Sequence, residues 1–253
     1  MIKTFKTGNL QVNVYENREE MGRIAALEVS AAIQNVLKEK EFCNMIFAAA
    51  PSQNEVLAAL AKDRSIDFTR VNAFHMDEYI GLPADAPQAF GLFLRRAIFD
   101  KAPFHSVHYI NGNAEDITSE CKRYAELLEK HPIDIVLLGI GENGHVAFND
   151  PPVANFSDAE VIKTVPLDPI CRQQQVNDGC FASINLVPTH ALTLTVPTLM
   201  AAKQLFCVVP AATKANAVHA TIFGEISTSC PASIMRNHAN ATLYLDPDSA
   251  SLV

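Results

Sequence analysis

The stretch that most constrains the fold runs from Ile133 to Pro152 and reads IDIVLLGIGENGHVAFNDPP. Its first six residues are apolar except for Asp134. A short apolar run that ends in glycine is typical of a buried strand in a parallel sheet. Gly139, Gly141 and Gly144 come next, and polar residues gather around them. Because ligands bind at the carboxyl ends of strands in open α/β sheets, this stretch predicts both a parallel sheet and a ligand site at its edge.

The same three glycines match the dinucleotide-binding pattern G-x-G-x-x-G. That pattern requires a helix that begins at the third glycine, with an acidic residue about 20 positions later. Here Pro151 and Pro152 follow soon after Gly144, and proline interrupts a helix. We therefore expect a glycine turn that brings an imidazole and a carboxylate to a cleft, rather than a dinucleotide site.

The rest of the chain alternates apolar runs with helical patterns. Strands are expected at residues 10–15, 44–50, 69–76, 107–111, 133–138, 160–165, 188–195, 205–210 and 241–245. Helices are expected at 18–40, 55–60, 89–99, 114–130, 168–176, 196–200, 215–222 and 232–237. This alternation predicts an α/β fold with a doubly wound, mainly parallel open sheet and helices on both faces, similar to a Rossmann fold. We expect residues 1–253 to form a single domain.

Composition limits the classes of function. A hydrophobic content of 49% and a charged content of 19% indicate a globular protein. The 20 basic and 28 acidic side chains give a net charge of −8, which argues against a nucleic-acid or anionic-membrane surface. The N-terminus has no apolar signal core, and no run of about 18 apolar residues is present. Six cysteines without CxxC spacing favour thiols in a reducing compartment, so we expect a cytoplasmic protein.

Two positions suggest an anion site. Ser52 lies between the expected strand 44–50 and the expected helix 55–60, where the unpaired amides of a helix start can bind an anion. An ordinary N-cap explains Ser52 equally well. Lys214 lies in the first turn of the helix expected at 215–222. A cation there opposes the helix dipole unless an anion shares the site, so a phosphate ligand is suggested.

Two further candidates have ordinary alternatives. Asp77 and Glu78 follow the strand expected at 69–76. Adjacent side chains point in different directions, so at most one of them faces a cleft, and a solvated pair is the more frequent case. Arg172 lies in the polar helix expected at 168–176, and a lone arginine is more often a surface residue than a ligand.

Four segments stand out, in this order along the chain: FHMDEYIGL at 74–82, NGNA at 111–114, LGIGENGHVAFNDP at 138–151 and TKA at 213–215. Together they resemble the glucosamine-6-phosphate deaminase (isomerase) family. The resemblance covers most of the chain, and its MDEY and GHxAFN segments are specific. It implies conversion of an aldose 2-amino-sugar 6-phosphate, glucosamine 6-phosphate or a close relative, to the ketose phosphate and ammonia. It also implies that no cofactor and no metal take part.

The resemblance assigns roles to residues at matching positions. Asp77 would be the base that removes the C2 proton and returns it at C1. His145 would move the proton that opens the pyranose ring, Asp150 would orient that imidazole, and Lys214 would bind the phosphate. The remaining expected site residues are Asn143 in the catalytic group, and Ser52, Gln53, Gly144 and Arg172 at the substrate.

The chain departs from the family pattern at several of these positions. Asp150 stands where members commonly have glutamate, and Asn143 where they often have aspartate. The phosphate loop, usually Thr/Ser-Gly-Gly, is here Ala-Pro-Ser-Gln at 50–53. Pro51 lacks a backbone N–H donor, so we expect the phosphate to depend more on side chains. The offset of Arg172 also differs from that of the family's arginine.

Two alternatives remain open. The 6-phosphogluconolactonase branch shares the glycine-histidine core, but a different segment follows its histidine, and arginine rather than Tyr79 follows its Asp-Glu pair. A sugar-phosphate-binding regulator with weak catalysis is the alternative from another class. In each case the expected partner is a small phosphorylated sugar, and homo-oligomerisation stays open.

Overall fold

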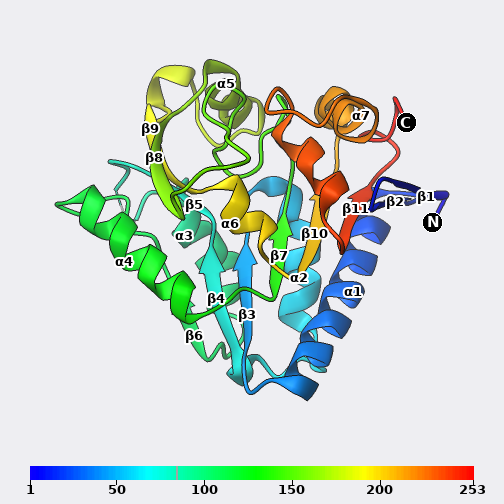
Figure 1. Cartoon of the computed structure of the whole chain (residues 1–253), viewed down its shortest axis with the longest axis horizontal. Coiled ribbons are helices and arrows are strands. Elements are labelled where there is room, and N and C mark those ends of the chain that lie inside the picture. The colour runs from blue at the N-terminus through cyan, green and yellow to red at the C-terminus, as the bar shows by residue number, and fades with distance from the viewer. Residues whose placement is uncertain (84) are drawn as a thin grey trace.

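The computed structural model describes residues 1–83 and 85–253, and within them the strands form two sheets. The strands of the larger sheet are β1 (Lys3–Thr7), β2 (Leu10–Val14), β3 (Cys43–Phe47), β4 (Val71–His75), β6 (Ser106–His108), β7 (Ile135–Leu138), β10 (Gln204–Val209) and β11 (Ala241–Leu245). Their order is β1-β2-β11-β10-β7-β3-β4-β6 (Figure 1). Only the β1–β2 pair is antiparallel among these described strands. The expected mainly parallel α/β sheet is confirmed.

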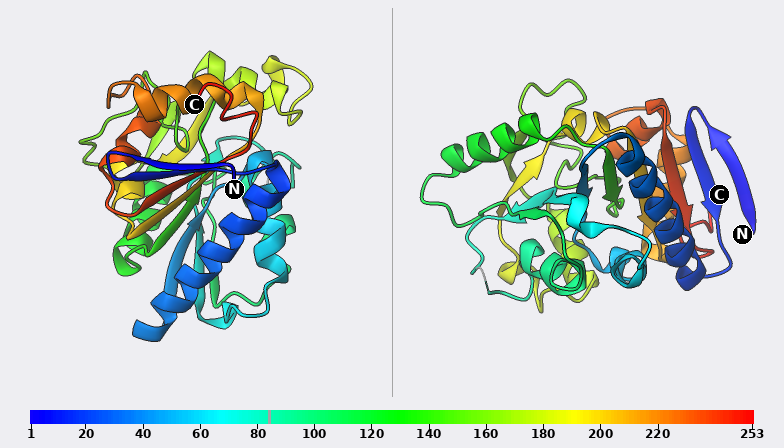
Figure 2. Two further views of the ribbon diagram at one scale, coloured as in Figure 1. Left: turned by 90° about the vertical axis from the view of Figure 1, so that its right-hand side faces the viewer. Right: turned by 90° about the horizontal axis from the view of Figure 1, so that it is seen from below.

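Helices cover both faces of the larger sheet (Figure 2). One face packs against α1 (Arg18–Glu39), α2 (Asn54–Lys62) and α3 (Phe90–Leu94), and the other against α4 (Ile117–Lys130), α6 (Val196–Met200) and α7 (Ala215–Phe223). Alternate strand residues supply the two cores. Phe47 and Leu137 belong to the first, and Ile46 and Val136 to the second. Burial on both faces explains why β3 and β7 carry apolar residues on both sides.

The chain reverses its direction across the sheet between β3 and β7. From β3 it continues outward to β4 and β6, whereas from β7 it continues to the opposite side, to β10 and β11. Ligands bind at such switch points, beyond the carboxyl ends of the strands. The segments that follow β3 and β7 are residues 48–53 and 139–145. The fold therefore brings the two segments predicted to form the site side by side.

A second, three-stranded antiparallel sheet lies beyond the carboxyl ends of the parallel strands (Figure 1). Its order is β5 (Asp77–Tyr79), β9 (His190–Leu194), β8 (Ile162–Pro166), and α5 (Pro169–Asn177) lies next to it. β8 and β9 correspond to the strands predicted at 160–165 and 188–195. That they form a separate sheet was not predicted. β5 has only three residues, too few to show an alternating pattern. Asp77 pairs with Thr193 in this sheet.

Several predicted boundaries differ from those observed. The helix predicted at 232–237 is a 3-10 helix, Pro231–Asn237, and the helix predicted at 89–99 is α3 followed by a π-helical segment, Arg95–Phe99. The edge strand β1 was missed. No helix among the described residues is long and apolar enough to cross a bilayer. The six cysteines are free in the described chain, as expected.

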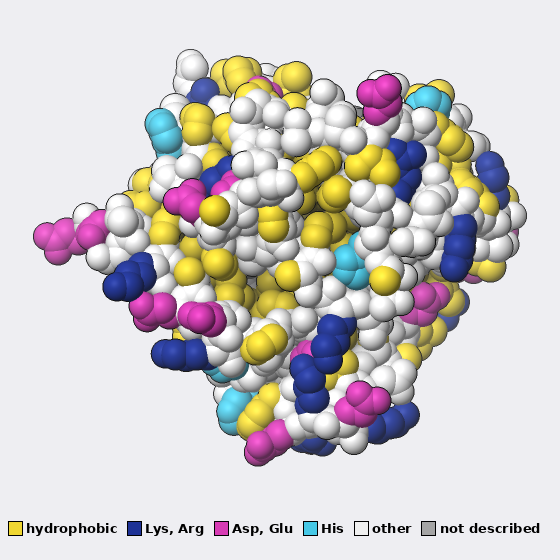
Figure 3. Space-filling view, in the orientation of Figure 1, with side chains coloured by type: hydrophobic (Ala, Val, Ile, Leu, Met, Phe, Trp, Pro, Cys, Tyr) yellow, Lys and Arg dark blue, Asp and Glu magenta, His cyan; other side chains and the backbone are white. Residues whose placement is uncertain are grey.

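On the face shown in Figure 3, hydrophobic side chains gather towards the middle, and acidic and basic side chains are mixed around them.

Candidate active site

A cavity opens at the switch point, beyond the ends of β3 and β7. Four of the predicted site residues line it, and they come from four different segments: Ser52, Asp77, His145 and Lys214. Ser52 follows β3, Asp77 begins β5, His145 lies in the glycine turn after β7, and Lys214 immediately precedes α7. The fold therefore gathers a carboxyl group, an imidazole, a hydroxyl and an ammonium around one space.

The glycines of the turn make room for the imidazole. A Cβ atom at Gly141 would lie 2.1 Å from Cε1 of His145, so only glycine lets the ring pack against the backbone there. Gly144 has φ +84°, a conformation that glycine adopts without strain. Gly144 does not line the cavity, so its contribution is to the shape of the turn. Residues 139–161, all of them described, contain no helix. A dinucleotide-binding site requires a helix that begins at the third glycine, so this segment does not form one.

Two side chains, those of Asp150 and Asn143, contact the Nδ1 side of the His145 imidazole. Its Nδ1 lies 2.9 Å from Oδ1 of Asp150 and 2.8 Å from Oδ1 of Asn143. Asn143 Nδ2 in turn donates to Asp150 Oδ1 at 2.8 Å. Asp150, although shorter than the glutamate that is common at this position, thus reaches the imidazole ring directly. Because Nδ1 faces these acceptors, Nε2 is the nitrogen that is left for a ligand in the cavity.

The groups around Asp150 determine the pKa of its carboxyl group. Burial alone would raise the pKa of its carboxyl group, but the hydrogen bond and charge of His145 and the hydrogen bonds from Asn143 and Cys171 outweigh burial. The pKa of Asp150 is therefore lowered from its ordinary value. An ionised Asp150 favours a proton on Nδ1 of His145, which leaves Nε2 free to accept one.

The two adjacent acids point in different directions. Asp77 lines the cavity, and burial, together with the neighbouring charge of Glu78, raises the pKa of Asp77 well above its ordinary value. Glu78 turns away and accepts backbone N–H bonds from Tyr79, Phe90 and Gly91 at 2.9, 3.1 and 2.8 Å. One acid faces the cleft, and the other caps the start of α3.

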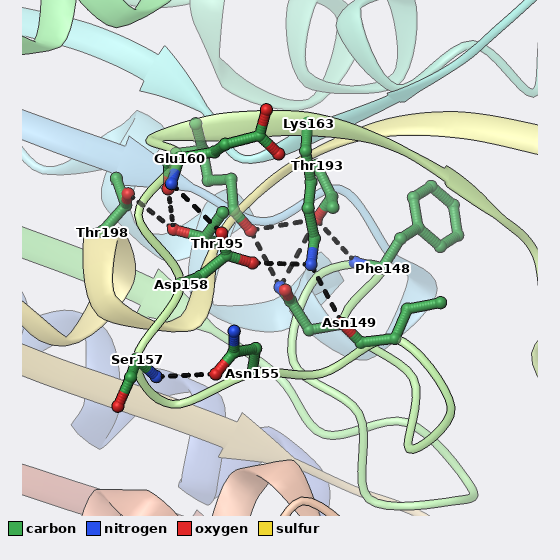
Figure 4. A network of polar contacts seen from close by, with 12 residues as sticks. Phe148, Asn149, Asn155, Ser157, Asp158, Glu160, Lys163, Thr193, Thr195 and Thr198 are labelled. Carbon is green, nitrogen blue, oxygen red and sulfur yellow. Dashed lines mark hydrogen bonds and ion pairs between the residues drawn. The ribbon is translucent and has the colours of Figure 1, made fainter.

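Strand β9 connects Asp77 to the turn that contains His145. Thr193 pairs with Asp77 across the small sheet, and its Oγ1 accepts from the backbone N–H of Phe148 at 3.0 Å. Asn149 Nδ2 donates to the carbonyl of Leu194 at 2.8 Å. Figure 4 shows Phe148 and Asn149 converging on Thr193. The small sheet thus fixes the glycine turn relative to the acid.

Two basic side chains line the cavity as well. Lys214 is 5% exposed, and its Nζ has no hydrogen-bond partner among the described residues. Burial lowers the pKa of Lys214 from its ordinary value. Arg18 also lines the cavity, where its Nη2 donates to the carbonyl of Pro51 and its Nε lies 2.7 Å from Glu55. The charges of Asp178 and Glu142 offset part of the effect of burial on Lys214, and an anion bound in the cavity would offset more of it.

Ser52 and Gln53 belong to the loop that follows β3. Ser52 makes no side-chain cap to the short 3-10 helix Pro51–Gln53 or to α2, so the N-cap alternative is wrong. Its Oγ accepts instead from Gln53 Nε2 at 3.0 Å. Gln53 also donates to the carbonyl of Val208 at 3.1 Å and lies behind Ser52 rather than on the cavity wall. Gln53 therefore supports the loop.

The structure does not bring Arg172, predicted to bind the substrate, to the cavity. Its Nη2 donates to the carbonyls of Ile184 and Val187, each at 2.8 Å, and the residue does not line the cavity. The guanidinium is occupied in holding the segment after α5.

Arg18 was missed because it opens an amphipathic helix and looks like an ordinary surface residue. Gln174, Gln175 and Asp178 also line the cavity, and the polar face of their helix was the only signal for them.

Comparison with known proteins shows the family to which the chain is related. The profile of the family described as "Glucosamine-6-phosphate isomerases/6-phosphogluconolactonase" matches residues 16–244. A glucosamine-6-phosphate deaminase from Bacillus cereus (strain G9842) is 35% identical over 220 residues, which are 87% of this chain and 82% of the relative. The chain belongs to this family. The resemblance of the four segments is confirmed, and the protein is an enzyme of the glucosamine-6-phosphate deaminase/isomerase type.

Solved structures of the family share the fold. A monomeric glucosamine-6-phosphate deaminase superposes with a TM-score of 0.87 at 30% identity, over 96% of this chain and 99% of its own. A 6-phosphogluconolactonase from Thermotoga maritima gives a TM-score of 0.77 at 18% identity, over 94% and 99% of the two chains, and shows likeness of fold alone. The family supports a small phosphorylated sugar as the ligand.

Proposed function

We propose that this enzyme converts a 2-amino-2-deoxyhexose 6-phosphate, glucosamine 6-phosphate or a close relative, to fructose 6-phosphate and ammonia. The observation that supports this most strongly is the unpartnered ammonium of Lys214 in the cavity that Asp77 and His145 also line. A buried ammonium without hydrogen-bond acceptors is costly, and the charges of Asp178 and Glu142 offset the effect of burial on Lys214 only in part, because its pKa stays lowered. A phosphate group would supply acceptors and further negative charge, and the rest of the sugar would then extend towards the acid and the imidazole.

The phosphate end would be bound by side chains more than by backbone. Pro51 offers no N–H group, so Ser52 Oγ in the loop and Lys214 Nζ before α7, which both belong to residues of the cavity lining, would be the donors. Arg18 orients the loop through the carbonyl of Pro51 and adds positive charge at the cavity. Gln53 keeps Ser52 in place.

Ring opening would depend on His145. Its Nε2, with Nδ1 directed at Asp150 and Asn143, accepts the proton of the anomeric hydroxyl and delivers one to the ring oxygen as the C1–O5 bond breaks. The product is the open-chain aldehyde. An imidazole suits both directions of transfer because its ordinary pKa lies near neutrality.

Isomerisation would depend on Asp77. Its carboxylate removes the proton from C2, which forms an enol-amine, and returns a proton to C1, which leaves an imine at C2. One molecule of water then hydrolyses this imine, giving the C2 ketone and ammonia. A single carboxylate can serve both carbons because they are adjacent. Burial raises the pKa of Asp77, and a carboxylate destabilised in this way is a stronger base.

The direct test is ammonia release from glucosamine 6-phosphate by the wild type and by Asp77→Asn. The substitution removes the base but preserves the shape of the side chain, so we expect at least about a hundredfold loss in kcat with KM nearly unchanged. Tight binding of the substrate without turnover by the wild type would instead support a regulator. Hydrolysis of 6-phosphogluconolactone without ammonia release from any amino-sugar phosphate would support a lactonase.

A further inference from the structure

Residues 110–113 have no part in the proposed mechanism, although they include most of the NGNA segment that the chain shares with its family. They lie against β5, the edge strand of the small sheet, which begins with Asp77. A Cβ atom at Gly112 would lie 1.9 Å from the carbonyl oxygen of Tyr79, and the carbonyl of Gly112 accepts from the backbone N–H of Gly81 at 3.1 Å. β9 pairs with one edge of β5, and this segment packs against the strand from elsewhere.

His75, the last residue of β4, joins this segment to the residue that begins β5. It is 0% exposed, and its Nε2 accepts from the backbone N–H of Ile110 at 2.8 Å. A neutral imidazole that accepts at Nε2 carries its proton on Nδ1. The backbone carbonyl of Asp77 is the acceptor that this proton faces, in a geometry looser than that of a full hydrogen bond. The two ring nitrogens are therefore directed at Ile110 and at Asp77.

Burial keeps the imidazole of His75 neutral. It lowers the pKa of His75 to about 4, because the hydrogen bond with the backbone of Asp77 and the charge of Glu120 oppose burial only in part. The contact with Ile110 requires this neutral form, since a protonated ring would direct a second N–H at the N–H of Ile110. The ring is thus suited to a fixed structural contact and not to proton transfer near neutral pH.

The backbone of His75 is fixed as well. The hydroxyl of Tyr124, from α4, donates to the carbonyl of His75 at 2.9 Å and accepts from its N–H at 3.1 Å. The ring centroids of Tyr109 and Tyr124 lie 5.9 and 6.5 Å from that of the imidazole. Because its backbone and its ring are both held, His75 gives the start of β5 a fixed point of attachment.

We propose that His75 is a positioning residue: its imidazole, placed between the N–H of Ile110 and the carbonyl of Asp77, sets where the carboxyl group of Asp77 lies in the cavity. β5 has only three residues and pairs with β9 alone, so contacts outside the sheet decide how its first residue is held. A small displacement of a group that transfers protons costs about a hundredfold in rate. The effect of His75 on catalysis rests on the proposed function, whereas its effect on the position of Asp77 does not.

The position of Asp77 is tested by an NMR titration of its carboxyl carbon. Burial and the charge of Glu78 raise the pKa of Asp77 in the wild type. His75→Leu removes both polar contacts of the ring, so Asp77 should become more hydrated and its pKa should fall towards the ordinary value. His75→Gln, whose amide can accept and donate in place of the ring, should stay close to the wild type.

Asn72→Leu is the matched control. Asn72 is a buried residue of the same strand, and the substitution removes its hydrogen bonds with Asn44 and Ser106 but no contact with β5. The pKa of Asp77 should not change in this variant. An unchanged pKa in His75→Leu, or an equal fall in both leucine variants, would overturn the proposal.

The tautomer of His75 is tested in the wild type, without any substitution. Proton–nitrogen NMR spectra at neutral pH should show a proton on Nδ1 of His75 and none on Nε2. A proton on Nε2 would overturn the proposal, whether or not His75→Leu folds. Circular dichroism and the melting temperature report the folding of each variant.

The consequence for catalysis is tested by ammonia release from glucosamine 6-phosphate. In His75→Leu, kcat should fall at least about tenfold with KM nearly unchanged, because the acid is displaced while the anion-binding residues are not. His75→Gln should recover most of the rate, and Asn72→Leu should keep the wild-type kcat. Equal loss of kcat in both leucine variants would contradict the proposal. A His75-dependent pKa of Asp77 in a protein that releases no ammonia would keep the positioning role and reject the proposed function.

Discussion

At the scale of single residues, burial and the neighbouring charge, which would suit Asp77 to its proposed role as a base, make the folded protein less stable. Its carboxyl group is buried next to Glu78, and both factors raise the pKa of Asp77. An acid with a raised native pKa destabilises the fold once it ionises. Lys214 has the complementary problem, because burial lowers its pKa. A substrate that brings a phosphate to Lys214 relieves part of this cost, so ligand binding and stability are linked.

The Asp77→Asn variant should be more stable than the wild type in a pH-dependent way. Below pH 3.8, the ordinary pKa of the group, the acid is protonated in both the folded and unfolded states, so the two proteins should differ little. As the pH rises towards and through the raised native pKa, the wild type loses stability relative to the variant. Melting temperatures measured from pH 4 to 8 test this. A difference that is constant with pH, or that shrinks as pH rises, would show that burial of the charge is not the cause.

Ala211, which lines the cavity together with Lys214, has a strained backbone. It has φ +86°, a conformation that costs a non-glycine residue about 1 to 3 kcal/mol. Ala211→Gly should therefore stabilise the protein by about 1 kcal/mol, after the entropy of the unfolded glycine is subtracted. The free energy of unfolding, measured in urea, tests this prediction. Ala212→Gly, at a neighbour in the 3-10 helix Ala212–Lys214, is the matched control and should destabilise. Destabilisation by both substitutions would contradict the assignment of strain.

At the scale of elements, the small antiparallel sheet is the part that connects the two proposed catalytic groups. β5 supplies Asp77, and β9 holds the turn after β7 through Thr193. The sequence predicted the strands of β8 and β9 but not their separation from the parallel sheet, because strand patterns do not specify pairing partners. The position of His145 could be predicted from its motif, whereas its support by Thr193 depends on contacts 45 residues apart along the chain.

Thr193→Val should test the role of this connection. Valine keeps the shape but leaves the backbone N–H of Phe148 without its acceptor, which costs about 1 to 3 kcal/mol. We expect kcat to fall about tenfold to a hundredfold with little change in KM, and Thr193→Ser to restore it.

Thr195→Val is the control for Thr193→Val. It also removes a buried hydroxyl, which donates to the carbonyl of Glu160, but it makes no contact with the turn. Loss of kcat to the same extent in both valine variants would indicate a general structural effect instead.

At the scale of the whole molecule, the pattern of strands and helices was sufficient to predict the sheet and the edge at which the site lies. The central strands β3, β7 and β10 carry apolar residues on both faces, and the switch point follows from the order of the strands. Arg18 could not be predicted, because it reaches the cavity only through the packing of α1 beside the loop after β3. We propose that the chain folds as a single domain, since β2 and β11, from its two ends, pair in one sheet.

The most direct test of the central claim is a crystal structure with an open-chain amino-sugar alcohol 6-phosphate bound. The proposed function predicts the phosphate within hydrogen-bond distance of Lys214 Nζ and Ser52 Oγ, C1 and C2 beside the carboxyl group of Asp77, and the C5 hydroxyl facing His145 Nε2. A phosphate bound away from Lys214, or C1 and C2 out of reach of Asp77, would contradict it.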